Sequence, residues 1–106
     1  MSSAPEQMQR ALRRCRPLEA CGVVLRSGAV VELTNPLDVP GRFTFIPEEY
    51  ADFAPLTVAI WHTHPNGSRV PSAADIAGHP PGVDMLIVTD EGVFWHGDPT
   101  RQDPAS

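Results

Sequence analysis

The sequence predicts one mixed α/β (α+β) domain, with a single, mostly antiparallel β-sheet flanked by two or three helices. Three observations support this fold class. The chain has 106 residues, which suits one domain, and its apolar content of 42% is that of ordinary globular proteins. Helical periodicity and short apolar runs alternate along it, separated by Gly and Pro turn signals. We assign residues 1–97 to this domain and expect the polar segment 98–106 to be a disordered tail.

A helix is predicted near the N-terminus. Ser3 and Glu6 have the spacing of a capping box, and Pro5 is compatible with the first helical turn. Pro17 ends the helix. Apolar residues recur at helical spacing on one face: Met8, Ala11, Leu12 and Cys15.

Two strands and a loop follow this helix. The apolar run 20–25 predicts a buried strand, and a Ser-Gly turn returns the chain as a second strand in residues 29–33. Residues 35–41 form a loop bounded by Pro and Gly. Residues 42–46 predict a further short strand, because Phe, Thr and Ile favour strands.

A second helix begins at Pro47, where two glutamates lie near the positive end of its dipole, and it ends at Pro55. Residues 57–62 form a strand that is apolar on both faces, so we expect it inside the sheet. After a loop, residues 72–77 form a short helix. Two final strands, 84–89 and 93–96, form a hairpin.

Composition excludes several functional classes. The net charge of −5 does not provide the basic surface typical of nucleic-acid binding. No apolar run approaches the roughly 18–20 residues that span a bilayer, and residues 1–10 lack the apolar core of a signal peptide. Two cysteines, Cys15 and Cys21, suggest neither a disulfide framework nor a Cys-rich zinc site. We expect a cytoplasmic protein without nucleic-acid or membrane partners; its oligomeric state stays open.

Two histidines, His62 and His64, lie at the end of the 57–62 strand. Side chains two apart in a strand point to the same face, so both imidazoles should emerge side by side. Asp75 follows eleven residues after His64, in the first turn of the helix opened by Ser72. Two imidazoles and a carboxylate predict a metal site, because catalytic zinc sites commonly use three protein ligands and leave one position for water.

Each residue alone has an ordinary structural explanation. Ser72 and Asp75 fit a helix-capping pattern that stabilises a helix by about 1 kcal/mol without a metal. The combination is more informative, since chance gives these identities at these spacings in roughly one such chain in several thousand. Among the other candidates, Cys21 is interpreted as a packed core residue rather than a nucleophile. We expect Trp61 in the core, and His79 and His96 at the surface.

The segments 62–65 (His-Thr-His-Pro), 71–75 (Pro-Ser-x-x-Asp) and 19–22 (Glu-Ala-Cys-Gly) together resemble the JAMM metallopeptidase family, also called the JAB or MPN-plus domain. The resemblance extends from about residue 17 to about residue 89 and implies a cytidine-deaminase-like JAB/MPN fold. It implies that three residues bind Zn²⁺: His62, His64 and Asp75. It also implies that Glu19 deprotonates the zinc-bound water and that Ser72 supports the tetrahedral intermediate.

The resemblance implies a zinc-dependent peptidase that cleaves isopeptide bonds or C-terminal tails. Its partner would be a peptide or protein ending in an extended diglycine tail, such as a ubiquitin-like or sulfur-carrier protein. Cell-wall peptides, associated with bacterial and phage-tail relatives, are an open alternative. The chain lacks the insertions of larger deubiquitinases, which favours a small prokaryotic-type member. Its acidic character beyond residue 18 favours a basic tail.

Three other functional classes fit the sequence less well. A non-catalytic interaction module would typically lose ligands that this chain keeps. A nucleobase deaminase requires His-x-Glu and a later Pro-Cys-x-x-Cys, which are absent. A DNA-repair-associated, RadC-like relative is disfavoured by the negative charge. Iron, cobalt or manganese could occupy the same three ligands in vitro.

Overall fold

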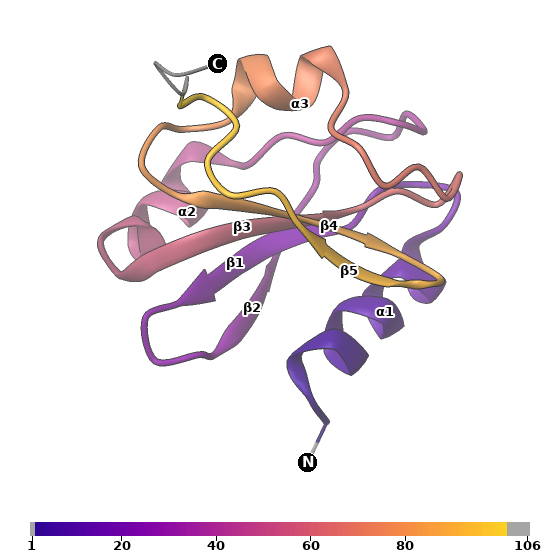
Figure 1. The fold of residues 1–106 in the computed structure, drawn as a ribbon, viewed down its shortest axis with the longest axis horizontal. Helices are drawn as coiled ribbons and strands as arrows, with labels where there is room; N and C mark the ends of the chain where they lie inside the picture. The colour runs from indigo at the N-terminus through magenta and orange to yellow at the C-terminus, as the bar shows by residue number, and fades with distance from the viewer. Residues whose placement is uncertain (1, 102–106) are drawn as a thin grey trace.

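A computed structural model describes residues 2–101 and contains one five-stranded sheet, in the order β2-β1-β3-β4-β5 (Figure 1). Neighbouring strands are antiparallel except for β3 and β4, which are parallel. The expected single, mostly antiparallel sheet is therefore confirmed, with the 57–62 strand at its centre. The strands are β1 (Cys21–Leu25), β2 (Val30–Leu33), β3 (Thr57–Thr63), β4 (Asp84–Thr89) and β5 (Gly92–Trp95).

Three α-helices pack around this sheet within the described residues: α1 (Ala4–Cys15), α2 (Pro47–Phe53) and α3 (Ala73–Gly78). A short 3-10 helix, η1 (Ala54–Leu56), joins α2 to β3. The Ser3 hydroxyl accepts a hydrogen bond from the Glu6 N–H at 3.2 Å, as the capping pattern predicts. In Figure 1, α1 and α3 lie on opposite sides of the sheet.

The side-chain alternation of β3 divides the core between the two faces of the sheet. Trp61 is buried against Met8 and Ala11 of α1, which confirms its predicted place in the core. Ile60 points to the opposite face and packs with Val23. A Cβ at position 22 would lie 2.6 Å from the Trp61 ring, so only glycine lets β1 approach it.

The segment that follows β2 covers the second face without joining the sheet. Residues 42–46 are not a strand, so that prediction was wrong. The outer edges of the sheet are β2 and β5, and residues 42–46 pair with neither, because burial of Phe43 and Phe45 holds the segment over the face that carries Ile60. Phe43 and Phe45 instead pack as apolar cover against the sheet, together with Tyr50 and Phe53 of α2.

Two histidines expected at the surface are less exposed than predicted. His79 is only 8% exposed, and its Nε2 lies 2.8 Å from the Val83 carbonyl oxygen. His96 is half-buried, with Nε2 2.6 Å from the Arg69 carbonyl oxygen. The surface prediction was therefore wrong for His79, because the Val83 carbonyl supplies a partner that lets its imidazole be buried. His96 remains partly exposed.

Part of the expected disordered tail contacts the domain. The Asp98 carboxylate accepts hydrogen bonds from the Gly82 N–H at 2.8 Å and from the Thr100 N–H at 3.0 Å. Residues 102–106 of that segment lie outside the described residues. Among residues 2–101, no helix has the length and apolarity needed to cross a bilayer.

Candidate metal centre

Backbone pairing between β1 and β3 positions Glu19 and His62, the first two residues of the site. Cys21 lies opposite His62 in the antiparallel register, and the Thr63 N–H donates to the Ala20 carbonyl at 2.9 Å. The Ala20 N–H in turn donates to the Thr63 hydroxyl at 2.8 Å, which extends the pairing to the residue beside Glu19. Because side chains alternate along a strand, Glu19 and His62 emerge on the same face.

His64 lies just beyond β3, where its N–H donates to the Val88 carbonyl at 2.8 Å and continues the pairing with β4. Its Nδ1 lies 3.0 Å from the Ser68 carbonyl oxygen. A carbonyl only accepts, so Nδ1 carries the proton and the ring is oriented by that bond. Nε2 therefore points toward the other side chains of the site.

The start of α3 supplies the carboxylate. The Ser72 hydroxyl accepts from the Asp75 N–H at 3.0 Å, and Asp75 Oδ2 accepts from the Ser72 N–H at 2.9 Å. This is a complete capping box, which fixes the Asp75 side chain relative to the helix. The same Oδ2 lies 3.1 Å from His64 Nε2. The capping and ligand interpretations of Asp75 are thus compatible in one geometry.

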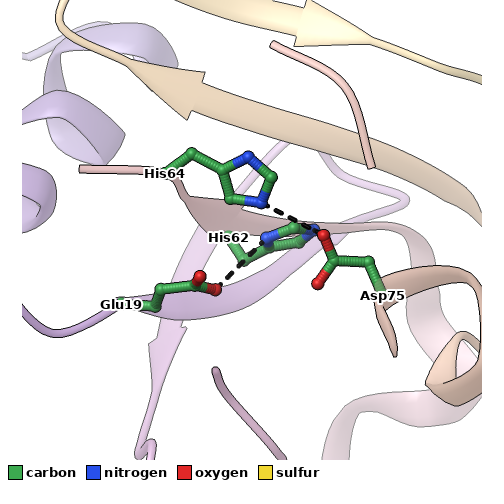
Figure 2. Close-up of side chains that lie close together, drawn as sticks. All are labelled: Glu19, His62, His64 and Asp75. Atoms are coloured by element: carbon green, nitrogen blue, oxygen red, sulfur yellow. Dashed lines mark hydrogen bonds and ion pairs between the residues drawn. The ribbon is translucent and has the colours of Figure 1, made fainter. Parts of the chain in front are cut away.

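His62 occupies the centre of the cluster and is fully buried. Its Nδ1 lies 3.6 Å from Glu19 Oε1, and its Nε2 lies 4.0 Å from Asp75 Oδ2 (Figure 2). Both separations exceed hydrogen-bonding distance. In the described residues, four buried side-chain polar atoms lack a partner; three belong to this site, namely Glu19 Oε1 and both nitrogens of His62.

The unpartnered atoms of Glu19 and His62 suggest that a metal ion would fit between these side chains. An unsatisfied buried polar group costs about 1–3 kcal/mol, so several at one point favour an additional partner there. One donor atom from each of four residues lies within 4.8 Å of the others: Glu19, His62, His64 and Asp75. Imidazole nitrogens with carboxylate oxygens are the donors that zinc prefers, together with thiolates. The residues present therefore fit a metal ion.

His64 and Asp75 shift each other's pKa. Burial raises the Asp75 pKa, but the hydrogen bond from His64 and the neighbouring His62 outweigh it, so the pKa falls to about 2. Burial lowers the His64 pKa, but the bond to Asp75 and the charge of Glu19 raise it above its ordinary value overall. Without a metal, the two form an ion pair over a range of acidic pH.

Cys21 packs beside the site without taking part in it. It is fully buried, and burial, with lesser effects from nearby carboxylates, raises its pKa to about 12. Its thiol lies 3.8 Å from the Leu33 carbonyl oxygen. A thiol that stays protonated at neutral pH is a poor nucleophile, which agrees with the interpretation of Cys21 as a packed residue.

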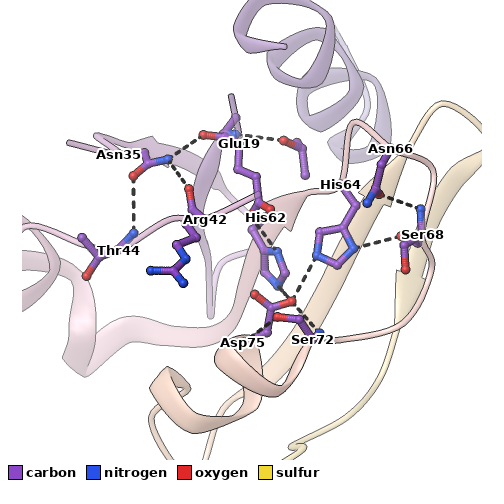
Figure 3. A network of polar contacts seen from close by, with 12 residues as sticks. Glu19, Asn35, Arg42, Thr44, His62, His64, Asn66, Ser68, Ser72 and Asp75 are labelled. Carbon is purple, nitrogen blue, oxygen red and sulfur yellow. Dashed lines mark hydrogen bonds and ion pairs between the residues drawn. The ribbon is translucent and has the colours of Figure 1, made fainter. Parts of the chain in front are cut away.

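Two contributors to the site were not predicted from the sequence. Asn35 donates through Nδ2 to the Glu19 carbonyl at 2.9 Å and to the Arg42 carbonyl at 3.1 Å, while its Oδ1 accepts from the Thr44 N–H at 3.4 Å (Figure 3). Phe43, on the segment that Asn35 secures, stacks on the His62 ring. An Asn before Pro signals only a turn, and no local pattern indicates these contacts.

A mixed sheet with α-helices on both faces, and a buried Glu-His-His-Asp cluster where its central strand ends, are the features of a JAB-type α+β domain. The family model described as prokaryotic homologs of the JAB domain matches residues 1–98, so the chain belongs to this family. A search of curated proteins found no match to the chain. The resemblance seen in the sequence is confirmed at the level of family and fold.

Proposed function

We propose that this protein is a zinc-dependent metallopeptidase that hydrolyses amide bonds in isopeptides or C-terminal tails. One observation carries the proposal. His62, with no hydrogen-bond partner on either ring nitrogen, lies between the Asp75 carboxylate and a second buried carboxylate, Glu19. Three residues suffice to hold a catalytic zinc, so the fourth is available for proton transfer.

His62, His64 and Asp75 would hold the zinc. A zinc ion bound there would supply a Lewis acid and lower the pKa of a water molecule to about 7. The protein contributes rigidity, because His64 is oriented by the Ser68 carbonyl and Asp75 by the capping box. These contacts keep both donors in place before a metal arrives.

Glu19 would act as the general base. Its Oε1 is buried and has no hydrogen-bond partner, so it is free to accept a proton from the attacking water. The same oxygen would then deliver that proton to the leaving nitrogen. Ser72 would donate its hydroxyl hydrogen to the substrate carbonyl oxygen as negative charge develops. The Ser72 oxygen is already oriented, because it accepts the Asp75 N–H.

The substrate is proposed from the family resemblance and the cluster's chemistry. Extended tails of ubiquitin-like or sulfur-carrier proteins are the first candidates, and cell-wall peptides are the second. Both contain amide bonds in flexible segments that could enter a site on the surface of so small a domain.

Glu19→Gln tests the proposed function, because it preserves shape while removing the base. The variant should bind zinc like the wild type and hydrolyse tail-amide, isopeptide and cell-wall-type peptides about 10²- to 10⁴-fold more slowly. Glu48→Gln, at an exposed position of α2, is the matched control and should behave like the wild type. Amine release is measured by mass spectrometry. If Glu19→Gln cleaves as fast as the wild type, Glu19 is not the base; if zinc-loaded wild type cleaves no substrate, the domain is better explained as an interaction module.

A further inference from the structure

A hollow of about 370 Å³ opens beside Asp75. It lies between residues 41–45, which cover the sheet, and α3 with the residues that follow it. We call it the acyl hollow. Six of the ten side chains that line it are apolar, and the polar ones include Arg42 and Asp75; the apolar six are Leu37, Phe43, Phe45, Ile60, Ala74 and Pro80.

The acyl hollow is large enough for a bulky side chain. An apolar cavity of about 150 Å³ can hold benzene, so this space has room for a phenyl ring or a leucine side chain. Gly78 lines it without contributing a side chain, and a Cβ at that position would meet nothing within 4 Å. The free space therefore extends up to the backbone of α3.

A second hollow, of about 610 Å³, borders Glu19 instead of Asp75. Its lining is more polar and includes Arg14, Glu32 and Asn35. Leu37 borders both hollows. The four-residue cluster thus has one hollow at its Glu19 end and one at its Asp75 end, with His62 between those two carboxylates.

The site of proton transfer determines which half of the substrate lies in which hollow. This orientation rests on the proposed function, in which Glu19 delivers a proton to the leaving nitrogen. The nitrogen must lie within hydrogen-bonding reach of Glu19, so the amine half of the substrate occupies the hollow that Glu19 borders. The acyl half then extends past Asp75 into the acyl hollow.

We propose that the acyl hollow receives one large apolar side chain from the last three residues on the acyl side of the cleaved bond. Such a side chain would be removed from water against Ile60 and the two phenylalanines. An all-glycine tail would leave this apolar space unfilled and gain nothing from it. The protein therefore selects tails with a bulky apolar residue near the cleaved bond.

Binding of product-like peptides tests this without turnover. The probes are four N-acetyl tripeptides with free carboxylates: triglycine, and three in which one glycine is replaced by phenylalanine. They are titrated into the zinc-loaded full-length chain by calorimetry, and methyl NMR of Ile60 locates the bound peptide. At least one phenylalanine peptide should bind about 10- to 100-fold more tightly than triglycine, as expected for burying one large apolar side chain.

Gly78→Phe should fill the acyl hollow and abolish this preference. Ala77→Phe adds the same side chain at the neighbouring exposed position outside the hollow's lining, and should retain the preference. If Gly78→Phe does not fold, as judged by circular dichroism, Ala74→Leu narrows the same hollow from α3. Equal binding of all four peptides to the wild type, or an unchanged preference in the filled variants, would overturn the inference.

The same experiment separates this inference from the proposed function. Preferential binding at Ile60 without cleavage of the corresponding peptide amides shows that the hollow takes an apolar side chain, but it contradicts the peptidase and therefore the assignment of the hollow to the acyl side. Cleavage of triglycine and phenylalanine amides at equal rates supports the peptidase and overturns the selectivity.

Discussion

The ring of Phe43 stacks on the ring of His62, with centroids 4.6 Å apart and planes inclined by 24°. The two residues come from different parts of the chain, one from the segment outside the sheet and one from β3. The stack covers the candidate ligand at the centre of the site and restricts its rotation. The segment that carries Phe43 thus contacts the candidate metal centre and also covers the core.

Phe43→Ala should weaken zinc binding. Removing the ring frees His62 to reorient, and loss of such outer contacts typically costs 10- to 100-fold in metal affinity. Phe45→Ala is the matched control, because Phe45 is also half-buried but stacks on Tyr50, at 5.0 Å between centroids. Zinc affinity is measured by competition with a chelating dye. Similar affinities in the two variants would show that the stack on His62 is incidental.

Asn35→Ala should lower both stability and turnover. It removes the amide that joins the Glu19 carbonyl to the Arg42 carbonyl, at a cost of about 1–3 kcal/mol in the free energy of unfolding. Because Glu19 is displaced but remains, kcat should fall while bound zinc stays near the wild-type level. Gln9→Ala on α1, which loses the hydrogen bond that the Gln9 side-chain amide donates to the Thr89 carbonyl, should leave kcat unchanged. Urea unfolding and peptide hydrolysis are the measurements, and a normal kcat in Asn35→Ala argues against its positioning role.

Ser72 caps α3, and we propose that its hydroxyl also donates a hydrogen bond to the substrate. Ser72→Ala should lose about 1 kcal/mol of stability and also lose activity. Ser72→Asp supplies an acceptor for the Asp75 N–H but no donor, so it should recover stability without recovering kcat. Thermal unfolding and hydrolysis rates are compared for both variants. Recovery of kcat in Ser72→Asp would exclude a donor role for the hydroxyl.

The His64–Asp75 ion pair predicts a pH window for the metal-free protein. The raised His64 pKa stabilises the fold fully below its ordinary value of 6.5, and this contribution is lost as pH rises through the folded-state value. The lowered Asp75 pKa stabilises the fold above its ordinary value of 3.8, and this contribution is lost as pH falls toward about 2. The pair therefore contributes most between those two ordinary values.

Urea unfolding of chelator-treated protein checks this window. The stability difference between wild type and Asp75→Asn should be largest near pH 5 and smaller near pH 3 and pH 8, on the pKa directions above. Zinc affinity should show the opposite trend and rise from pH 5 to pH 8, because the metal must displace the proton on His64. A pH-independent difference would mean that the pair is not ionic in solution.

Local patterns predicted much of this structure. The apolar strand ending at His62, the His-x-His spacing and the Ser72 cap are all short-range signals, and the structure places the corresponding residues together. Asp84–Thr89 was predicted with its observed bounds for the same reason. These elements follow from periodicity and capping, which depend on neighbours in the sequence.

The failures involve contacts between distant parts of the chain. Residues 42–46 stay outside the sheet because Phe43 and Phe45 are buried against a face that is built by strands distant in the sequence. The stack of Phe43 on His62 and the bonds of Asn35 also join segments far apart in the sequence. Burial of His79 depends on the Val83 carbonyl, which the turn after α3 brings to it.

Metal content of the purified protein tests the central claim most directly. The wild type, purified without added metal, is compared by mass spectrometry with the His62→Ala, His64→Ala double variant. His96→Ala is the control, since His96 contacts Arg69 rather than the cluster. We predict about one zinc per chain in the wild type and in the control, and none in the double variant. A wild type that neither contains zinc nor takes it up, or a double variant that binds it equally well, would contradict the proposed metal centre.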